Sequence, residues 1–165
     1  MGRLKLSDSF IMESNGASWS SNTNLPKGSI LQMVYNTTTT EKATTSSSYQ
    51  SWDGLATNIT PIRSDSHLRI YVNAVRCLCQ ANSNNIYLRI TDGTNATHRW
   101  QHKNYDTDGN YEAVTPCHNW YWPIFHTAGT QITLTPELLS LDNSNNVIWG
   151  DSGSTSHMIV QEIAQ

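Results

Sequence analysis

The chain has 165 residues, 37% of them hydrophobic and 14% charged, which fits one domain with a substantial core. Ser, Thr and Asn make up about a third of the chain while Lys and Glu are scarce, and this strand- and turn-forming composition excludes a helical bundle. The formal net charge of −3, with its basic residues scattered, leaves no positive surplus to meet a phosphate backbone and so argues against nucleic-acid binding.

Residues 1–27 are predicted to be an extended N-terminal arm and linker. Apolar and polar residues alternate only briefly before Met12, and the segment from Glu13 to Asn24 has the Ser/Asn/Gly composition of a linker. Few residues of this arm could anchor it to a partner. The candidate anchors are its apolar side chains: Leu4, Leu6, Phe10, Ile11 and Met12.

The folded body is predicted to begin at Gly28 and to reach residue 165. Its first strand is expected over Ser29 to Tyr35, and the Ser/Thr-rich stretch from Thr37 to Ser48 is expected to be a solvated loop or an edge strand. The clearest strand is His67 to Cys79. Its predicted inward residues, with those of the strand that follows, are Leu68, Ile70, Val72, Ala74, Ile86, Leu88 and Ile90. After Ala74 the alternation slips, which indicates a bulge or bend.

Turn signals separate the later strands. Asp92-Gly93 predicts a hairpin between Ile86 to Thr91 and Thr94 to Lys103, and Asp108-Gly109 predicts another turn. Further strands are expected over Tyr111 to Val114, Asn119 to Phe125, Gln131 to Thr135, Asn146 to Trp149 and His157 to Ile163. Pro136 to Leu141 suits one helical turn or another strand. About nine short strands with frequent turns predict an all-β fold, a mostly antiparallel β-sandwich of jelly-roll type.

The sequence contains two candidate metal sites, and neither matches the spacing of a known metal-binding motif. Cys77, Cys79, Cys117 and His118 are the nearest cluster, but Cys-x-Cys on a strand differs from the Cys-x2-4-Cys knuckle of zinc sites, so buried structural thiols are the favoured interpretation. The segment from Asp106 to Glu112 alternates oxygen ligands but lacks the Gly and Glu of a calcium loop, and a hairpin turn is favoured there. We expect no metal and no cofactor.

Catalytic signatures are not found in the sequence. It contains no Gly-x-Ser-x-Gly, P-loop, His-Glu-x-x-His or Gly-x-Gly-x-x-Gly motif. Carboxylate pairs such as Asp53 with Asp65 could be assembled in space, but any sandwich offers such pairs. No apolar run reaches the roughly 18 residues of a membrane-spanning helix, and no export signal is readable at the N-terminus. With three cysteines, an odd number, synthesis in a reducing cytoplasm is favoured.

Aromatic residues are the remaining candidates for a binding surface. Rings on a sandwich face can stack on sugars, but they fill cores and subunit interfaces more often. The candidates for a glycan or subunit contact are Trp100, Tyr105, Trp120 and Trp122.

Four blocks of the body, in order, resemble a module of tailed-phage virion proteins, especially of marine phages. The blocks are Gly28-Ser-Ile-Leu-Gln-Met-Val34, Trp52-Asp-Gly-Leu-Ala-Thr-Asn-Ile-Thr-Pro61, Ser64-Asp-Ser-His-Leu-Arg-Ile-Tyr-Val-Asn73 and Ile159-Val-Gln-Glu-Ile-Ala164. The chain departs from the module at Phe125-His-Thr-Ala128, where the module commonly has Asp-Ser-Pro.

The resemblance implies a β-sandwich that is usually trimeric and sits on a virion as an appendage or decoration. The expected function is therefore that of a non-enzymatic homotrimeric capsid decoration, or cement, protein, anchored through its arm to the major capsid protein or another virion protein. The chain is short for a fibre with a shaft, which favours decoration slightly. The alternative is a tail-fibre or head-fibre tip that binds a host surface glycan or receptor.

Overall fold

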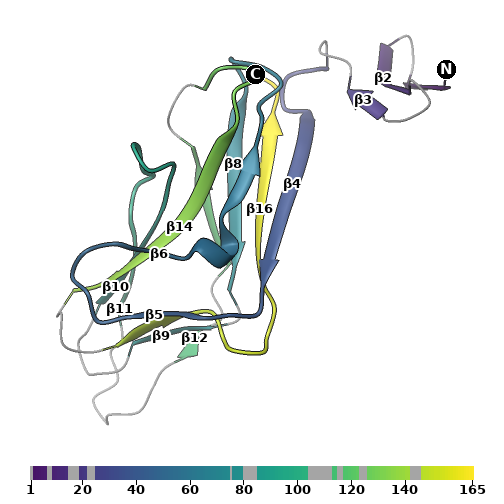
Figure 1. Ribbon diagram of the computed structural model, residues 1–165. Coiled ribbons are helices and arrows are strands. Elements are labelled where there is room, and N and C mark those ends of the chain that lie inside the picture. Colours follow the sequence, from purple (N-terminus) through teal and green to yellow (C-terminus); the bar gives the residue numbers. More distant parts are fainter. Residues whose placement is uncertain are drawn as a thin grey trace.

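The computed structural model confirms an all-β fold of antiparallel sheets, arranged as a β-sandwich (Figure 1). It describes residues 2–6, 9–14, 19–21, 25–74, 76–79, 85–103, 113–114, 117–122, 126–141 and 146–165. For residues 2–21, 79, 102–103 and 113–114 within these ranges it describes the backbone alone. No helix of the described part is long and apolar enough to cross a bilayer.

One layer of the sandwich is a four-stranded sheet in the order β13-β8-β16-β4, which we call the first sheet. Its strands are β4 (Ile30–Thr38), β8 (His67–Asn73), β13 (Cys117–Tyr121) and β16 (Ser156–Ile163). β4 runs further than predicted, into the Ser/Thr-rich stretch, because β16 pairs with it as far as Thr38. β13 begins before Asn119 and ends at Tyr121. β4 and β13 are the two edges of this sheet.

The opposing layer has the strand order β11-β10-β14-β6, with β7 also paired to β14. Its strands are β6 (Gln50–Ser51), β7 (Thr57–Ile59), β10 (Asn85–Thr91), β11 (Trp100–Lys103) and β14 (Ile132–Ser140). A short 3-10 helix, η1 (Asp53–Leu55), follows β6. The segment from Pro136 is therefore a strand, the second of its two predicted conformations. The Asp92-Gly93 turn lies between β10 and its antiparallel partner β11, as predicted, but β11 begins at Trp100 and not at Thr94.

A third sheet lies at one end of the sandwich, in the order β12-β9-β15-β5 (Figure 1). Its strands are β5 (Lys42–Thr44), β9 (Cys77–Cys79), β12 (Ala113–Val114) and β15 (Val147–Trp149). The bend predicted after Ala74 is the point where the chain leaves β8 of the first sheet and enters β9 of the third. The predicted turn at Asp108-Gly109 lies outside the described residues.

The predicted arm contains three short strands that pair with one another: β1 (Gly2–Leu6), β2 (Ser9–Ser14) and β3 (Trp19–Ser21). Leu4 of β1 is opposite Met12 of β2, and the register shifts between Leu4 and Lys5. The side chains of the five candidate anchors lie outside the described part. This small sheet is found at the end of the molecule where β4 begins (Figure 1).

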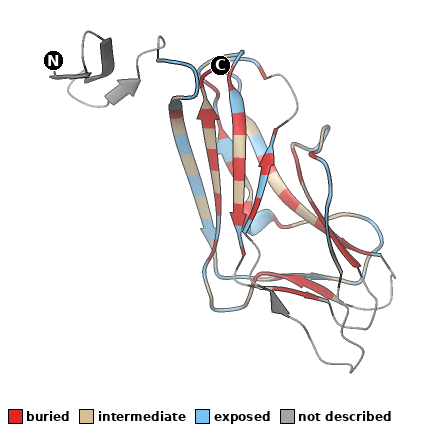
Figure 2. Cartoon of the chain, turned by 180° about the vertical axis from the view of Figure 1, so that it is seen from behind, coloured by how far each residue is buried: buried red, intermediate tan, exposed pale blue. Residues whose placement is uncertain are grey.

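The core lies between the first sheet and the opposing layer. Every inward residue predicted for the two clearest strands is fully buried. Alternation along β8 places one of its faces inside, whereas β10 is buried on both faces. Figure 2 shows buried residues alternating with more exposed ones along strands of the first sheet, as the burial of β8 and β16 requires. The core also contains Trp52, Trp120, Trp122 and Trp149.

Candidate functional site

The outer side of the first sheet is the candidate functional site, and we call it the outer face. It consists of the residues of β4, β8, β13 and β16 whose side chains alternate with the buried ones. These are Ile30, Met33, Tyr35, Thr37, His67, Arg69, Tyr71, Asn73, Cys117, Asn119, Tyr121, His157, Ile159, Gln161 and Ile163.

Strand register brings aromatic and aliphatic side chains into rows across this face. Tyr35 on β4 is opposite Ile159 on β16, which is opposite Tyr71 on β8. One step along, Arg69 of β8 lies between Gln161 of β16 and Tyr121 of β13. The exposed fractions are 72% for Tyr35, 57% for Met33 and 60% for Tyr121, so large apolar surfaces meet solvent on one flat sheet.

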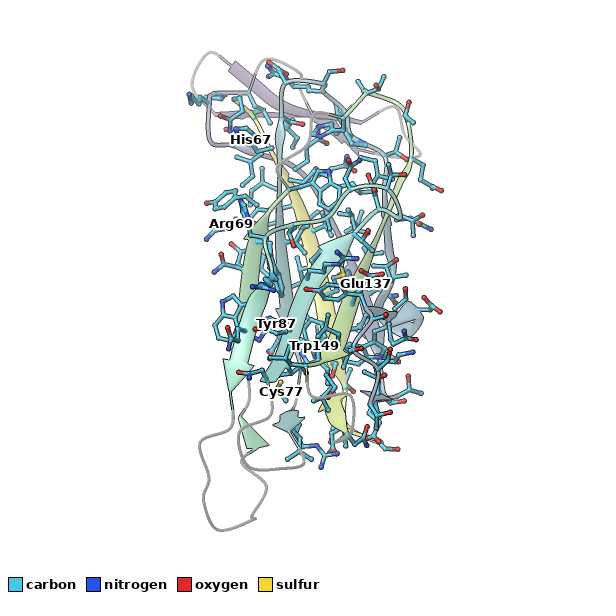
Figure 3. The ribbon with its side chains drawn as sticks, turned by 90° about the vertical axis from the view of Figure 1, so that its left-hand side faces the viewer. His67, Arg69, Cys77, Tyr87, Glu137 and Trp149 are labelled. Atoms are coloured by element: carbon cyan, nitrogen blue, oxygen red, sulfur yellow. The ribbon has the colours of Figure 1, made fainter. Side chains whose placement is uncertain are left out.

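Arg69 is the one arginine or lysine among the outer-face residues named above. Its guanidinium carbon lies 4.9 Å from the centre of the Tyr71 ring and 5.7 Å from that of Tyr121, within cation–π range. Its Nε is buried and has no hydrogen-bond partner in the described part of the chain. His67 and Arg69 lie on the same side of the molecule in Figure 3. The two tyrosine rings therefore lie close to a guanidinium whose charge no ion pair neutralises within the described part of the chain.

None of the outer-face residues is an aspartate or a glutamate, since Glu162 of β16 faces the interior. Protein–protein interfaces are enriched in Tyr, Met and Arg and depleted of Lys, Glu and Asp, and this face has that composition. Contiguous exposed apolar surface on a folded domain commonly marks a binding surface. The arrangement can therefore bury apolar rings against a partner and offer one cation to it.

The predicted aromatic contacts are not all at the surface. Trp120 and Trp122 are 6% and 4% exposed and belong to the core, so their rings are out of reach of a sugar. Trp100 is 44% exposed, and its ring centre lies 4.1 Å from that of His118, which in turn contacts Trp120. Tyr105 lies outside the described residues. Trp100 therefore covers the side of the sandwich between β11 and β13 and leaves part of its ring in solvent.

A buried polar network was missed from the sequence. Glu162 is fully buried, and its carboxylate accepts hydrogen bonds from the Ile62 and Arg63 amides, both at 2.9 Å, and from Ser66 Oγ at 2.6 Å. Gln32 Nε2 donates to the same carboxylate at 2.6 Å. The available signal was the alternation of β16, which places Glu162 in phase with buried Met158 and Val160.

The network resembles a hydrolase triad in residue types but not in arrangement. His126 Nε2 lies 2.9 Å from Ser66 Oγ, and the hydroxyl lies between the imidazole and the Glu162 carboxylate. In a catalytic triad the imidazole is in the middle, where it can take the hydroxyl proton. Here the Ser66 hydroxyl donates a hydrogen bond directly to the Glu162 carboxylate, an arrangement suited to fixing the turn before β8.

The structure does not bring the candidate cysteines, or the candidate pair Asp53 and Asp65, together in the described part of the chain. Cys77 is buried and Cys117 is exposed, while the Cys79 side chain lies outside the described part. In the described part no three His, Cys, Asp or Glu side chains gather to hold a metal ion. Asp65 pairs with Arg63 at 2.7 Å and not with Asp53.

Comparison with known proteins adds no constraint on this site. The sequence matches no protein-family model and no characterised protein at significant similarity.

Proposed function

We propose that the protein is a non-enzymatic structural protein that assembles with copies of itself through the outer face. The observation that carries the proposal is the exposure of Met33, Tyr35 and Tyr121 around Arg69 on a face without carboxylates. Edge strand β4 supports it, since on its outward side it pairs with no other strand of the described part. Self-association covers both the apolar face and the open edge.

The resemblance to the virion module gives this assembly its proposed setting. We infer a homotrimeric capsid decoration protein, made in the host cytoplasm and located on the virion. Residues 1–27 attach it to the major capsid protein or to another virion protein. The pairing of β1, β2 and β3 with one another supports a separate role for this segment.

Light scattering on the purified protein tests the assembly. The expected mass is three times the 18.5 kDa of one chain. A double variant, Met33→Ser with Tyr35→Ser, is expected to be monomeric at the same concentration, because both side chains expose large apolar areas on the outer face. Leu141→Ser is the matched control, since Leu141 is 51% exposed but follows β14 in the opposing layer. A monomeric wild type, or equal dissociation of the control, contradicts the proposal.

A second function, a glycan-binding fibre tip, is favoured by Trp100. Its partly exposed ring, which contacts the tilted ring of His118, is the kind of platform on which a sugar ring stacks. Titration of tryptophan fluorescence with host surface polysaccharide tests this function. Saturable quenching that Trp100→Ala abolishes would favour the fibre tip, and no quenching would leave decoration as the better account.

A further inference from the structure

We propose that Arg69 of one copy pairs with Asp53 of the neighbouring copy in the assembly. This inference rests on the proposed self-association and names the charged contact that orients it. It begins from Arg69, which has a buried Nε without a hydrogen-bond partner in the described part and lies within cation–π range of two tyrosine rings. A guanidinium fixed in this way presents its remaining N–H groups to a planar anion, and carboxylate is the anion whose geometry matches.

The described residues offer one such carboxylate without a partner. Glu41 and Asp151 pair with Arg76, Glu137 pairs with Arg89, Asp65 pairs with Arg63, Asp92 caps its own turn and Glu162 is buried. Asp53 is exposed, and its side chain has neither a hydrogen bond nor an ion pair within the described part of the chain. An unpaired cation on one surface and an unpaired anion on another are complementary charges.

Position in the fold supports contact between different copies. Asp53 begins η1, which is tied to β4 by hydrogen bonds from Asn36 Nδ2 to the carbonyls of Gly54 at 3.2 Å and Ala56 at 2.8 Å. Asp53 therefore lies on the side of the molecule bounded by edge strand β4. Arg69 is flanked by Tyr121 of β13, which forms the opposite edge of the same sheet.

This separation disfavours a two-fold axis that passes through Arg69. A two-fold contact between identical face centres would bring two Arg69 side chains together, which repulsion disfavours. If the Arg69 region of one copy meets the β4 side of the next, the contact joins two different surfaces. Such a head-to-tail contact closes into a ring when its rotation divides a full turn. The Arg69–Asp53 pair would then repeat at every interface of the ring, and Tyr35 and Met33 would be buried beside it.

Charge exchange tests the pair in the full chain. Arg69→Glu alone and Asp53→Arg alone are each expected to raise the dissociation constant of the assembly by about tenfold or more, because each places like charges together. The double variant restores opposite charges and is expected to return the constant to within about threefold of the wild type. Sedimentation over a dilution series measures the constants. The melting temperature of each variant shows whether the monomer is folded.

Asp65→Arg is the matched control, because it makes the same charge change at an exposed carboxylate that already has an internal partner. Its dissociation constant is expected to stay near that of the wild type. If the wild type assembles but Asp53→Arg has no effect, or the double variant is not rescued, the pair is wrong while self-association stands. If the wild type is monomeric, both the proposed function and the pair are wrong.

Discussion

Gly150 makes the closest contact of any described glycine. Its backbone φ is +94°, and a Cβ atom built on it would lie 2.7 Å from two ring carbons of Trp52. The Trp52 ring in turn contacts Trp149, with ring centres 5.3 Å apart. The absence of a side chain at position 150 thus allows two core tryptophans to pack against the turn after β15.

Replacing this glycine is expected to destabilise the fold by two separable effects. Gly150→Ala should cost about 1–2 kcal/mol for the left-handed backbone and about 1–3 kcal/mol more for the overpacked Trp52 ring. Gly153→Ala is the matched control, since Gly153 has a φ of +86° and open space around it. Chemical denaturation measures both variants. Equal losses of unfolding free energy in the two variants would show that the contact with Trp52 does not contribute to the destabilisation.

At this scale the sequence predicts buried aliphatic residues better than it predicts buried polar and aromatic ones. Leu68, Ile70 and Val72 follow from alternation alone because one sheet face must leave water. The burial of Glu162 depends on amides of Ile62 and Arg63, about a hundred residues away in the chain, so no local pattern reveals it. Residue type alone favours packing for Trp120 and Trp122 but does not exclude a surface platform, so the structure was needed to place them in the core.

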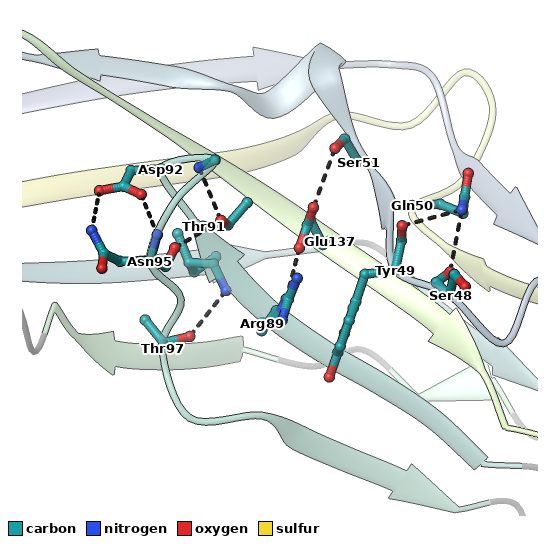
Figure 4. A network of polar contacts seen from close by, with 12 residues as sticks. Ser48, Tyr49, Gln50, Ser51, Arg89, Thr91, Asp92, Asn95, Thr97 and Glu137 are labelled. Carbon is teal, nitrogen blue, oxygen red and sulfur yellow. Dashed lines mark hydrogen bonds and ion pairs between the residues drawn. The ribbon is translucent and has the colours of Figure 1, made fainter.

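Among the elements, the β10–β11 hairpin carries a compact polar turn (Figure 4). The Asp92 carboxylate accepts hydrogen bonds from the Thr94 amide at 2.8 Å and the Asn95 amide at 2.6 Å. Partial burial would raise the pKa of Asp92, but the hydrogen bonds from Asn95 and Thr94 outweigh it and hold this pKa below its ordinary value. The charged form of Asp92 therefore stabilises the hairpin.

This hairpin gives a pH-dependent prediction. Because the pKa is depressed in the folded state, the stabilisation is fully present above the unfolded pKa, near 4, and is lost as the pH falls through the folded value. Asp92→Asn is expected to lower the free energy of unfolding by about 1 kcal/mol at pH 7, the difference between charged and neutral acceptors. The difference in free energy of unfolding between variant and wild type should become smaller below pH 4. Chemical denaturation of both proteins at pH 7 and at pH 3 measures this difference. A difference that is the same at both pH values contradicts the prediction.

β14 shows why one element could not be decided from the sequence. Proline is rare in inner strands because it lacks an N–H, yet Pro136 lies in β14 opposite Ile90 of β10. In an antiparallel strand the N–H and C=O of a residue point to the same side. The Pro136 carbonyl accepts a hydrogen bond from the Trp52 amide at 2.8 Å. The position of the missing N–H therefore faces the same side of β14, where the pairing with β6 has already ended. Only the neighbouring strands determine that this position tolerates proline.

For the whole molecule, the start of the body is tied to its last strand. The Gly28 amide donates to the Ala164 carbonyl at 2.8 Å, and the Ala164 amide donates to the Ser29 carbonyl at 2.9 Å. A protein consisting of residues 28–165 is therefore expected to fold and to melt within a few degrees of the full chain.

The same truncation tests attachment, because the proposal assigns that role to residues 1–27. Particles lacking the protein are expected to bind the full chain and not the truncated one, measured by co-sedimentation. A truncated protein that melts normally and still binds would move the attachment surface to the sandwich. A truncated protein that fails to fold would show that the folded body requires residues 1–27.

β16 is the last described strand along the chain, yet it occupies an inner position between β4 and β8. During synthesis, β4 and β8 leave the ribosome long before the strand that joins them exists. The first sheet can therefore form only after residues 156–163 emerge, and pairing across so many residues is slow. A ribosome that stalls before Ser156 would release a nascent chain with two unpaired strand edges, which are templates for aggregation. Translation through β16 is thus the step that allows the first sheet to be completed.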